Sequence, residues 1–199
     1  MLKKTAAALI ATLGFIGSAH AGLIGVTDIR ITKSAGSTVY IQLTEVQAFQ
    51  SGTGANVALA SNGGTAFAPN VWNSTSPASK AIDGQSANMS FPNMYHSAGT
   101  ASDYLNITLA MATELSSVTL FGRSDCCSSR DIFDVRFFGA NGQLLFTQLG
   151  ANAAGADHMV SFALPDTNVP EPASAALLGL GLMGLAAARR KRSAKRSVK

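Results

Sequence analysis

The stretch GRSDCCSSR, residues 122–130, holds both cysteines of this 199-residue chain, adjacent to each other as Cys126 and Cys127. A disulfide between adjacent cysteines closes no loop and therefore does little to stabilise the fold. It gives a rigid, largely apolar sulfur surface and is expected to distort the peptide between the two cysteines. Arg123 and Arg130 offer planar forks of N–H donors on either side, and Asp125 is placed to orient one of them. An apolar knob beside fixed donors suits a sugar, which has a C–H face and hydroxyl edges. Free thiols, a redox sensor or a loop without function are the alternatives.

The N-terminus has the features of a secretory signal peptide. A positively charged start is followed by a short run of small and apolar residues, and the chain then reads Ala-His-Ala before Gly22. This pattern predicts a signal peptide over residues 1–21 with cleavage between Ala21 and Gly22, whereas a membrane anchor needs a longer apolar run. Export brings the chain into an oxidising space, which favours a disulfide between Cys126 and Cys127.

The C-terminal segment, residues 169–199, has three parts. Pro170-Glu171-Pro172 precedes an uncharged run at 173–188, and seven basic residues follow at 189–199. The run is short for a full membrane span, and the basic end should stay cytoplasmic while the body lies outside, so a permanent tail anchor is the alternative. In order and composition this tail resembles the PEP-CTERM sorting signal. The resemblance implies exosortase processing, transient insertion into the inner membrane of a Gram-negative cell, and a final place at the outer surface or in the exopolysaccharide matrix.

Most of the positive charge lies in these two ends. Of the 15 Lys and Arg residues nine are terminal, which leaves six against ten Asp and Glu residues, because Glu171 is the one acid in the tail. The body therefore carries a charge of about −4 rather than the +4 of the whole chain. A basic whole-chain charge that belongs to targeting segments is no argument for nucleic-acid binding.

The body, residues 22–168, is long enough for one domain with its own core and is rich in short alternating segments. Gly, Ser and Asn turns separate these segments, and no amphipathic helix stands between them. The pattern predicts an all-β fold, an antiparallel β-sandwich or jelly roll. The expected strands lie around residues 29–31, 39–43, 105–109, 115–121, 133–137, 144–149 and 160–164.

The string Arg-x-Asp-Cys-Cys-x-x-Arg at 123–130 resembles the sugar motif of the fucolectin family, a branch of the discoidin or coagulation-factor type C jelly rolls with a galactose-binding-like fold. Twenty-six residues lie between His96 and Arg123, slightly more than the family spacing, and KAIDGQ at 80–85 is similar to the family's KAIDGN. The resemblance covers about residues 56–138. It implies that Cys126 and Cys127 are disulfide-bonded and pack on a bound fucose-like sugar.

The resemblance also implies roles for single residues. His96, Arg123 and Arg130 would hydrogen-bond the sugar hydroxyls and ring oxygen, and Phe91 and Tyr95 would line a pocket for a methyl group. On the residues alone, His96 is also explained as a loop histidine bonded to a backbone carbonyl. Arg130 is also explained by an ion pair with Asp125 or Asp131.

A structural calcium ion is a further implication of the resemblance. Calcium takes six to eight oxygen ligands. One ligand would come from Glu45 in LTEVQAF, which resembles a strand that ends the family's domain but here lies near its start. We therefore expect a circularly permuted jelly roll, with the tail of a lost preceding repeat as the alternative. Asp83 is equally explained as the turn residue of a DG pair. The candidate ligands are Glu45, Lys80 (backbone), Asp83, Gln85 (backbone) and backbone oxygens of Met94–Ser97, including Ser97.

These features favour a calcium-stabilised carbohydrate-binding protein of an extracellular polysaccharide matrix or biofilm. The alternative is a structural or adhesion protein of the matrix that binds no sugar. We expect no enzyme, because the chain has no G-x-S-x-G nucleophile motif, no histidine cluster for a metal and no P-loop. Asp125 with Asp131 or Asp134 is the weak exception, as a glycosidase pair.

Overall fold

The computed structural model describes residues 22–36, 40–167 and 180–181. In these residues the protein is all-β with antiparallel strand pairing, as the alternation predicted. The predicted N-terminal helix (1–21) lies outside the described residues. So does the apolar helix at 173–188, except that Leu180 and Gly181 are helical. None of the described helices is long and apolar enough to cross a membrane.

Nine strands and four 3₁₀ turns make up the described domain. The strands are β1 (Leu23–Lys33), β2 (Gln42–Leu43), β3 (Glu45–Gln50), β4 (Thr65–Phe67), β5 (Tyr95–His96), β6 (Leu105–Phe121), β7 (Ile132–Phe138), β8 (Leu144–Asn152) and β9 (Met159–Ala163). The 3₁₀ turns are η1 (Ala60–Asn62), η2 (Ala78–Ile82), η3 (Ser128–Arg130) and η4 (Ala140–Gly142). Two expected strands, at 105–109 and 115–121, are one long strand, β6, because the residues between them continue the pairing with β1, where Thr113 is opposite Val26.

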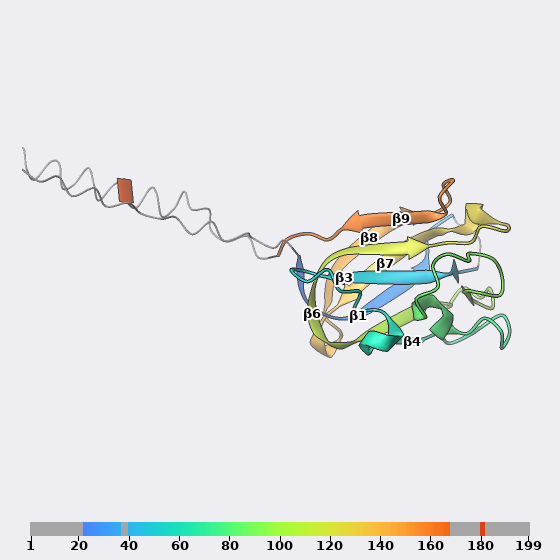
Figure 1. Cartoon of the computed structure of the whole chain (residues 1–199), viewed down its shortest axis with the longest axis horizontal. Helices are drawn as coiled ribbons and strands as arrows, with labels where there is room; N and C mark the ends of the chain where they lie inside the picture. The colour runs from blue at the N-terminus through green and yellow to red at the C-terminus, as the bar shows by residue number, and fades with distance from the viewer. Residues whose placement is uncertain (1–21, 37–39, 168–179, 182–199) are drawn as a thin grey trace, which may run out of the picture.

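The long strand β6 connects two layers of strands, as Figure 1 shows. Its first part pairs with β1 and β4, and its last part pairs with β3 and β9. On the other side of β1 lie β7 and then β8. A separate two-stranded ladder, β2 with β5, puts Gln42 opposite His96. Of the residues expected as a strand at 39–43, those at 40–43 are described, and Gln42 and Leu43 are the ones that form a strand.

The core lies between the two layers because inward residues alternate with outward ones along each strand. Ile29 and Ile31 of β1 are fully buried, while Arg30 between them is exposed. Phe137 of β7 packs 6.0 Å from Phe146 of β8 and 6.4 Å from Phe162 of β9, between ring centroids. Since β7 and β9 are not paired, the last contact joins the two layers.

The two ends of the described domain meet. The backbone N–H of Thr167 donates to the carbonyl of Gly22 (3.1 Å), and the N–H of Ile24 donates to the Thr167 hydroxyl (3.2 Å). Domain ends that lie together are compatible with a rearranged strand order.

Candidate functional site

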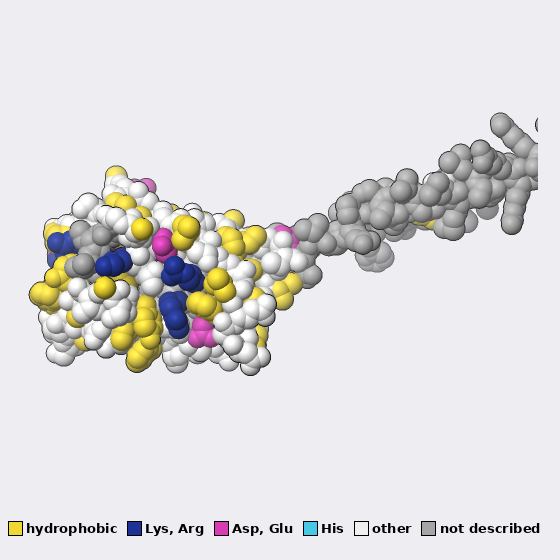
Figure 2. Space-filling view, turned by 180° about the vertical axis from the view of Figure 1, so that it is seen from behind, with side chains coloured by type: hydrophobic (Ala, Val, Ile, Leu, Met, Phe, Trp, Pro, Cys, Tyr) yellow, Lys and Arg dark blue, Asp and Glu magenta, His cyan; other side chains and the backbone are white. Residues whose placement is uncertain are grey.

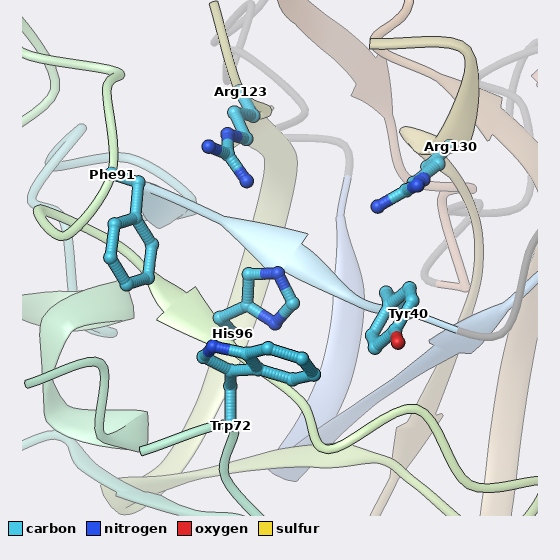
Figure 3. Close-up of a pocket in the computed structure, with 6 residues that line it drawn as sticks. All are labelled: Tyr40, Trp72, Phe91, His96, Arg123 and Arg130. Atoms are coloured by element: carbon cyan, nitrogen blue, oxygen red, sulfur yellow. The ribbon is translucent and has the colours of Figure 1, made fainter. Parts of the chain in front are cut away.

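A cavity of about 280 Å³ gathers four of the predicted sugar-site residues with two further aromatic side chains. Its lining is His96, Arg123, Arg130, Phe91, Tyr40 and Trp72. Figure 3 shows the two arginines on one side of the cavity, the Trp72 ring across from them and His96 between. None of the six lining residues is acidic, so the cavity offers donors and ring faces.

Arg123 is fixed by a two-pronged ion pair with Asp125. Its Nε donates to Oδ1 (2.6 Å) and its Nη2 to Oδ2 (3.0 Å), as predicted for an arginine oriented by this aspartate. The hydrogen bonds from Arg123 hold the pKa of Asp125 below its ordinary value. The guanidinium carbon also lies 5.5 Å from the centre of the Phe91 ring. These contacts leave Nη1 of Arg123 for a ligand and hold the guanidinium in place.

The loop between the two arginines is anchored by a buried carboxyl. Asp131 is fully buried, and its Oδ2 accepts the backbone N–H of Arg123 (2.7 Å). A side chain at Gly122 would place its Cβ in collision with Asp131, so glycine is required there. Oδ1 of Asp131 has no partner in the described part of the chain, and burial raises the pKa of this carboxyl to about 7. Arg130 lies with its guanidinium carbon 5.1 Å above the ring of Tyr40.

His96 is at the centre of the cavity as predicted, but protein groups already use both ring nitrogens. Nδ1 lies 2.8 Å from the carbonyl oxygen of Ser97, and Nε2 lies 2.7 Å from Nε2 of Gln42. A carbonyl only accepts, so Nδ1 carries the proton and Nε2 accepts from the Gln42 amide. Burial, with Arg123 and Arg130 nearby, lowers the pKa of His96 and keeps the ring neutral. The ring therefore presents its carbon edge to the cavity, and the predicted hydrogen bond from His96 to a sugar would have to replace the one with Gln42.

Aromatic rings surround His96 on three sides. The ring of Tyr40 lies 5.2 Å from it, that of Trp72 5.5 Å and that of Phe91 6.1 Å, between centroids. Tyr40 and Trp72 were not among the predicted site residues. Trp72 is the single tryptophan of the chain and is 53% exposed, although it lies in a loop. A single tryptophan in a polar loop is the sequence signal that could have identified Trp72, since exposed tryptophans are enriched at binding surfaces.

Tyr95 does not line the cavity, and its predicted role is corrected. It is fully buried in the core, and its hydroxyl donates to backbone carbonyls of Asn70 (3.3 Å) and Tyr104 (3.4 Å). Neighbouring residues in a strand point to opposite faces. Since His96 of β5 faces the cavity, Tyr95 beside it must face the core.

The disulfide between Cys126 and Cys127 is present. Their Cα atoms are 3.8 Å apart, the spacing of a trans peptide. Cys127 has a φ of 62°, in the left-handed region that non-glycine residues rarely adopt. Neither cysteine is among the residues that line the cavity, and Cys126 is exposed. The aromatic rings, rather than the disulfide, supply the apolar surface of the cavity.

The candidate metal residues meet around Glu45, which is fully buried at the start of β3. Its Oε2 accepts the backbone N–H of Gly84 (3.1 Å), which places it at the Asp83–Gly84 turn, and its Oε1 has no partner among the described residues. Burial, together with the charge of Asp83, raises the pKa of Glu45 to about 7. A buried carboxylate oxygen without a donor is the feature that a bound cation would satisfy.

The other candidate ligands are already engaged. Asp83 accepts the N–H of Gln85 (3.0 Å), the turn arrangement that was the alternative, and lies 3.8 Å from Lys80. The carbonyl of Ser97 receives Nδ1 of His96. No three His, Cys, Asp or Glu side chains within residues 22–36 and 40–167 come together as a metal site. A cation at Glu45 would therefore need backbone oxygens.

The fold and the cavity together define the class of protein: it is an all-β domain whose loops form a cavity lined by aromatic rings and arginines. Residues 168–192 match the PEP-CTERM protein-sorting motif, which confirms the predicted tail signal. No curated protein and no solved structure matches the chain. The motif indicates an exported protein that an exosortase sorts, with export through the cell envelope of a Gram-negative bacterium.

Proposed function

We propose that the protein is a non-catalytic carbohydrate-binding module that exosortase sorting delivers to the cell surface or its polysaccharide matrix. The observation that carries the proposal is that His96 lines one cavity with Arg123 and Arg130, which come from a distant loop, and with three aromatic rings. Rings of Trp72 and Tyr40 suit the apolar face of a sugar, and fixed guanidinium N–H groups suit its hydroxyl edge.

A jelly roll of the fucolectin type accounts for the same features. The Arg-x-Asp-x4-Arg string lies at the rim of the cavity, with Asp125 orienting Arg123. The strand that holds Glu45 comes early in the chain yet reaches the Asp83–Gly84 turn, as a circular permutation requires. The adjacent ends of the domain are also compatible with such a permutation.

A structural calcium ion at Glu45 is part of the proposal. The orphaned Oε1 and the nearby Asp83 supply negative charge, and backbone oxygens of the turn would complete the shell of six to eight ligands. The cation would satisfy a buried carboxylate that otherwise takes up a proton near neutral pH. It would thereby hold the turn against β3.

The direct test is a glycan array with the purified full chain in calcium, followed by titration of the best neutral deoxy sugar. Arg123→Ala should weaken binding at least about tenfold, because a hydrogen bond from a charged group contributes about 1.5–3 kcal/mol. Trp72→Ala should weaken binding as well, because it removes a ring face of the cavity. The variant should still fold, since Trp72 is 53% exposed and lies outside the core.

Arg30→Ala is the matched control, because Arg30 is an exposed arginine outside this cavity. It should keep full affinity for the same sugar. Full affinity of Arg123→Ala would refute the sugar assignment. A blank array from a folded protein would favour the alternative, a structural or adhesion protein that binds no sugar.

A further inference from the structure

A second cavity, of about 340 Å³, lies on the outer face of the layer that contains β1, β6 and β7. It shares no lining residue with the cavity around His96. Figure 2 shows the domain from behind, where Lys and Arg side chains lie beside acidic and hydrophobic ones. The lining residues of the second cavity are Asp28, Arg30, Asn106, Phe138 and Gly142.

Arg30 lies against two aromatic rings. Its guanidinium carbon lies 4.8 Å from the ring centre of Tyr104 and 5.3 Å from that of Phe138. Its Nε donates to Oδ1 of Asn106 (3.4 Å). No residue in the described part of the chain accepts a hydrogen bond from the two Nη atoms. The exposed side chain therefore keeps four N–H donors available in a fixed position.

A second arginine lies beside it. Arg136 of β7 is directly opposite Arg30 of β1 in the ladder, and like charges at such a position repel each other. Neither arginine has a carboxylate of the described residues within 4.0 Å, although Arg136 donates to the hydroxyl of Thr32 (3.2 Å). Two neighbouring guanidinium groups without an acidic partner form a place for an anionic group.

The nearby carboxylate of Asp28 is already satisfied. Its Oδ1 accepts from Asn106 (3.0 Å) and Thr108 (2.6 Å), and its Oδ2 accepts from Thr27 (2.9 Å). These bonds turn the carboxylate toward its neighbours in β1 and β6. The negative charge of Asp28 acts on Arg30 and offsets part of the local positive charge, but both carboxylate oxygens already accept hydrogen bonds, so the Nη donors of Arg30 remain for another partner.

The aromatic rings extend the surface across four strands. Phe67 of β4 is 58% exposed, and its ring centroid lies 6.2 Å from that of Tyr104. From Phe67 through Tyr104 and Arg30 to Phe138 the line crosses three strand spacings, about 14 Å in all. This length exceeds a single sugar ring and fits several linked units.

We propose that this face is a second binding site, for a stretch of an acidic polysaccharide whose sugars carry carboxylates. The carboxylates would pair with Arg30 and Arg136, and the C–H faces would stack on Phe67, Tyr104 and Phe138. A surface of alternating rings and guanidinium groups matches a polymer that is apolar on its ring faces and anionic at its edges. The site is independent of the sugar cavity around His96.

The test measures binding of the purified full chain to an oligogalacturonate of about six units by calorimetry. The fully methyl-esterified oligomer is the ligand control, because it keeps the sugar rings and loses the charges. We expect the acidic oligomer to bind at least about tenfold more tightly than the ester and less tightly as salt rises. Arg30→Gln should lower that affinity at least about tenfold, while Arg123→Gln, the matched variant in the other cavity, should leave it unchanged.

Phe67→Ala gives a second test on an exposed position that does not threaten folding. It should weaken binding of the six-unit oligomer and leave that of a dimer unchanged, because the dimer does not reach across to β4. Equal binding of acid and ester, full affinity of Arg30→Gln, or dependence on Arg123 instead would each overturn the proposal. Arg30-dependent binding of a sulfated but not a carboxylated oligomer would also overturn it. If the cavity at Arg123 binds no neutral sugar, the proposal for the second site is unaffected.

Discussion

Replacing Glu45 by Gln should change how the stability of the protein depends on pH. Glu45 is fully buried, and its pKa rises from an ordinary 4.5 to about 7. Between these two pH values the folded chain holds a proton that the unfolded chain has released. The free energy of unfolding therefore falls as pH rises through this window, and the contribution from Glu45 is lost above pH 7. A pKa difference of this size corresponds to roughly 3 kcal/mol.

The measurement is urea unfolding of wild type and Glu45→Gln at pH 4 and pH 8, with a chelator present. Wild type should lose roughly 3 kcal/mol more than the variant between the two pH values. The comparison of slopes is decisive, because the amide of the variant does not ionise, so the constant cost of its buried N–H donors cancels between the two pH values. Parallel pH profiles for the two proteins would refute the reasoning.

Added calcium should restore the stability that the wild-type protein loses as pH rises, and it should not do so in Glu45→Gln. A cation bound to the ionised carboxylate stabilises the folded state according to its concentration relative to its Kd, so at pH 8 the wild-type midpoint should rise with added calcium. Glu45→Gln should show little response. A wild-type midpoint that does not move with calcium would argue against a cation at Glu45 while leaving the pH prediction intact.

Three further predictions concern the loop around the cysteines and the cavity. Asp131→Asn should also flatten the stability profile between pH 4 and 8, because burial raises the pKa of Asp131 to about 7, and a profile as steep as that of wild type would contradict this. Cys126→Ser should cost about 1 kcal/mol or less in urea unfolding, since the disulfide closes no loop, and a loss of several kcal/mol would show that it does more. Titration of His96 should not change the sugar affinity between pH 6.5 and 8, because its lowered pKa keeps the ring neutral. A pH-dependent affinity that becomes independent of pH in His96→Gln would contradict this.

The sequence alone was enough for the features that are local in the chain. The tail signal is read from consecutive residues, so its order of Pro-Glu-Pro, apolar run and basic end could be predicted and is confirmed at 168–192. The strands follow from alternation with a period of two. The disulfide of Cys126 with Cys127, and the pairing of Arg123 with Asp125, join residues so close in sequence that few other arrangements are open to them.

Only the tertiary structure decided which distant residues share a surface. Tyr40 and Trp72 join His96 because loops from different parts of the chain fold over the short β2–β5 ladder. Arg30 and Arg136 lie side by side through the register between β1 and β7, which no local pattern encodes. Register and loop packing depend on the whole set of inward side chains, since shifting a strand by one residue exchanges its two faces. For the same reason Tyr95, next to His96 in sequence, belongs to the core.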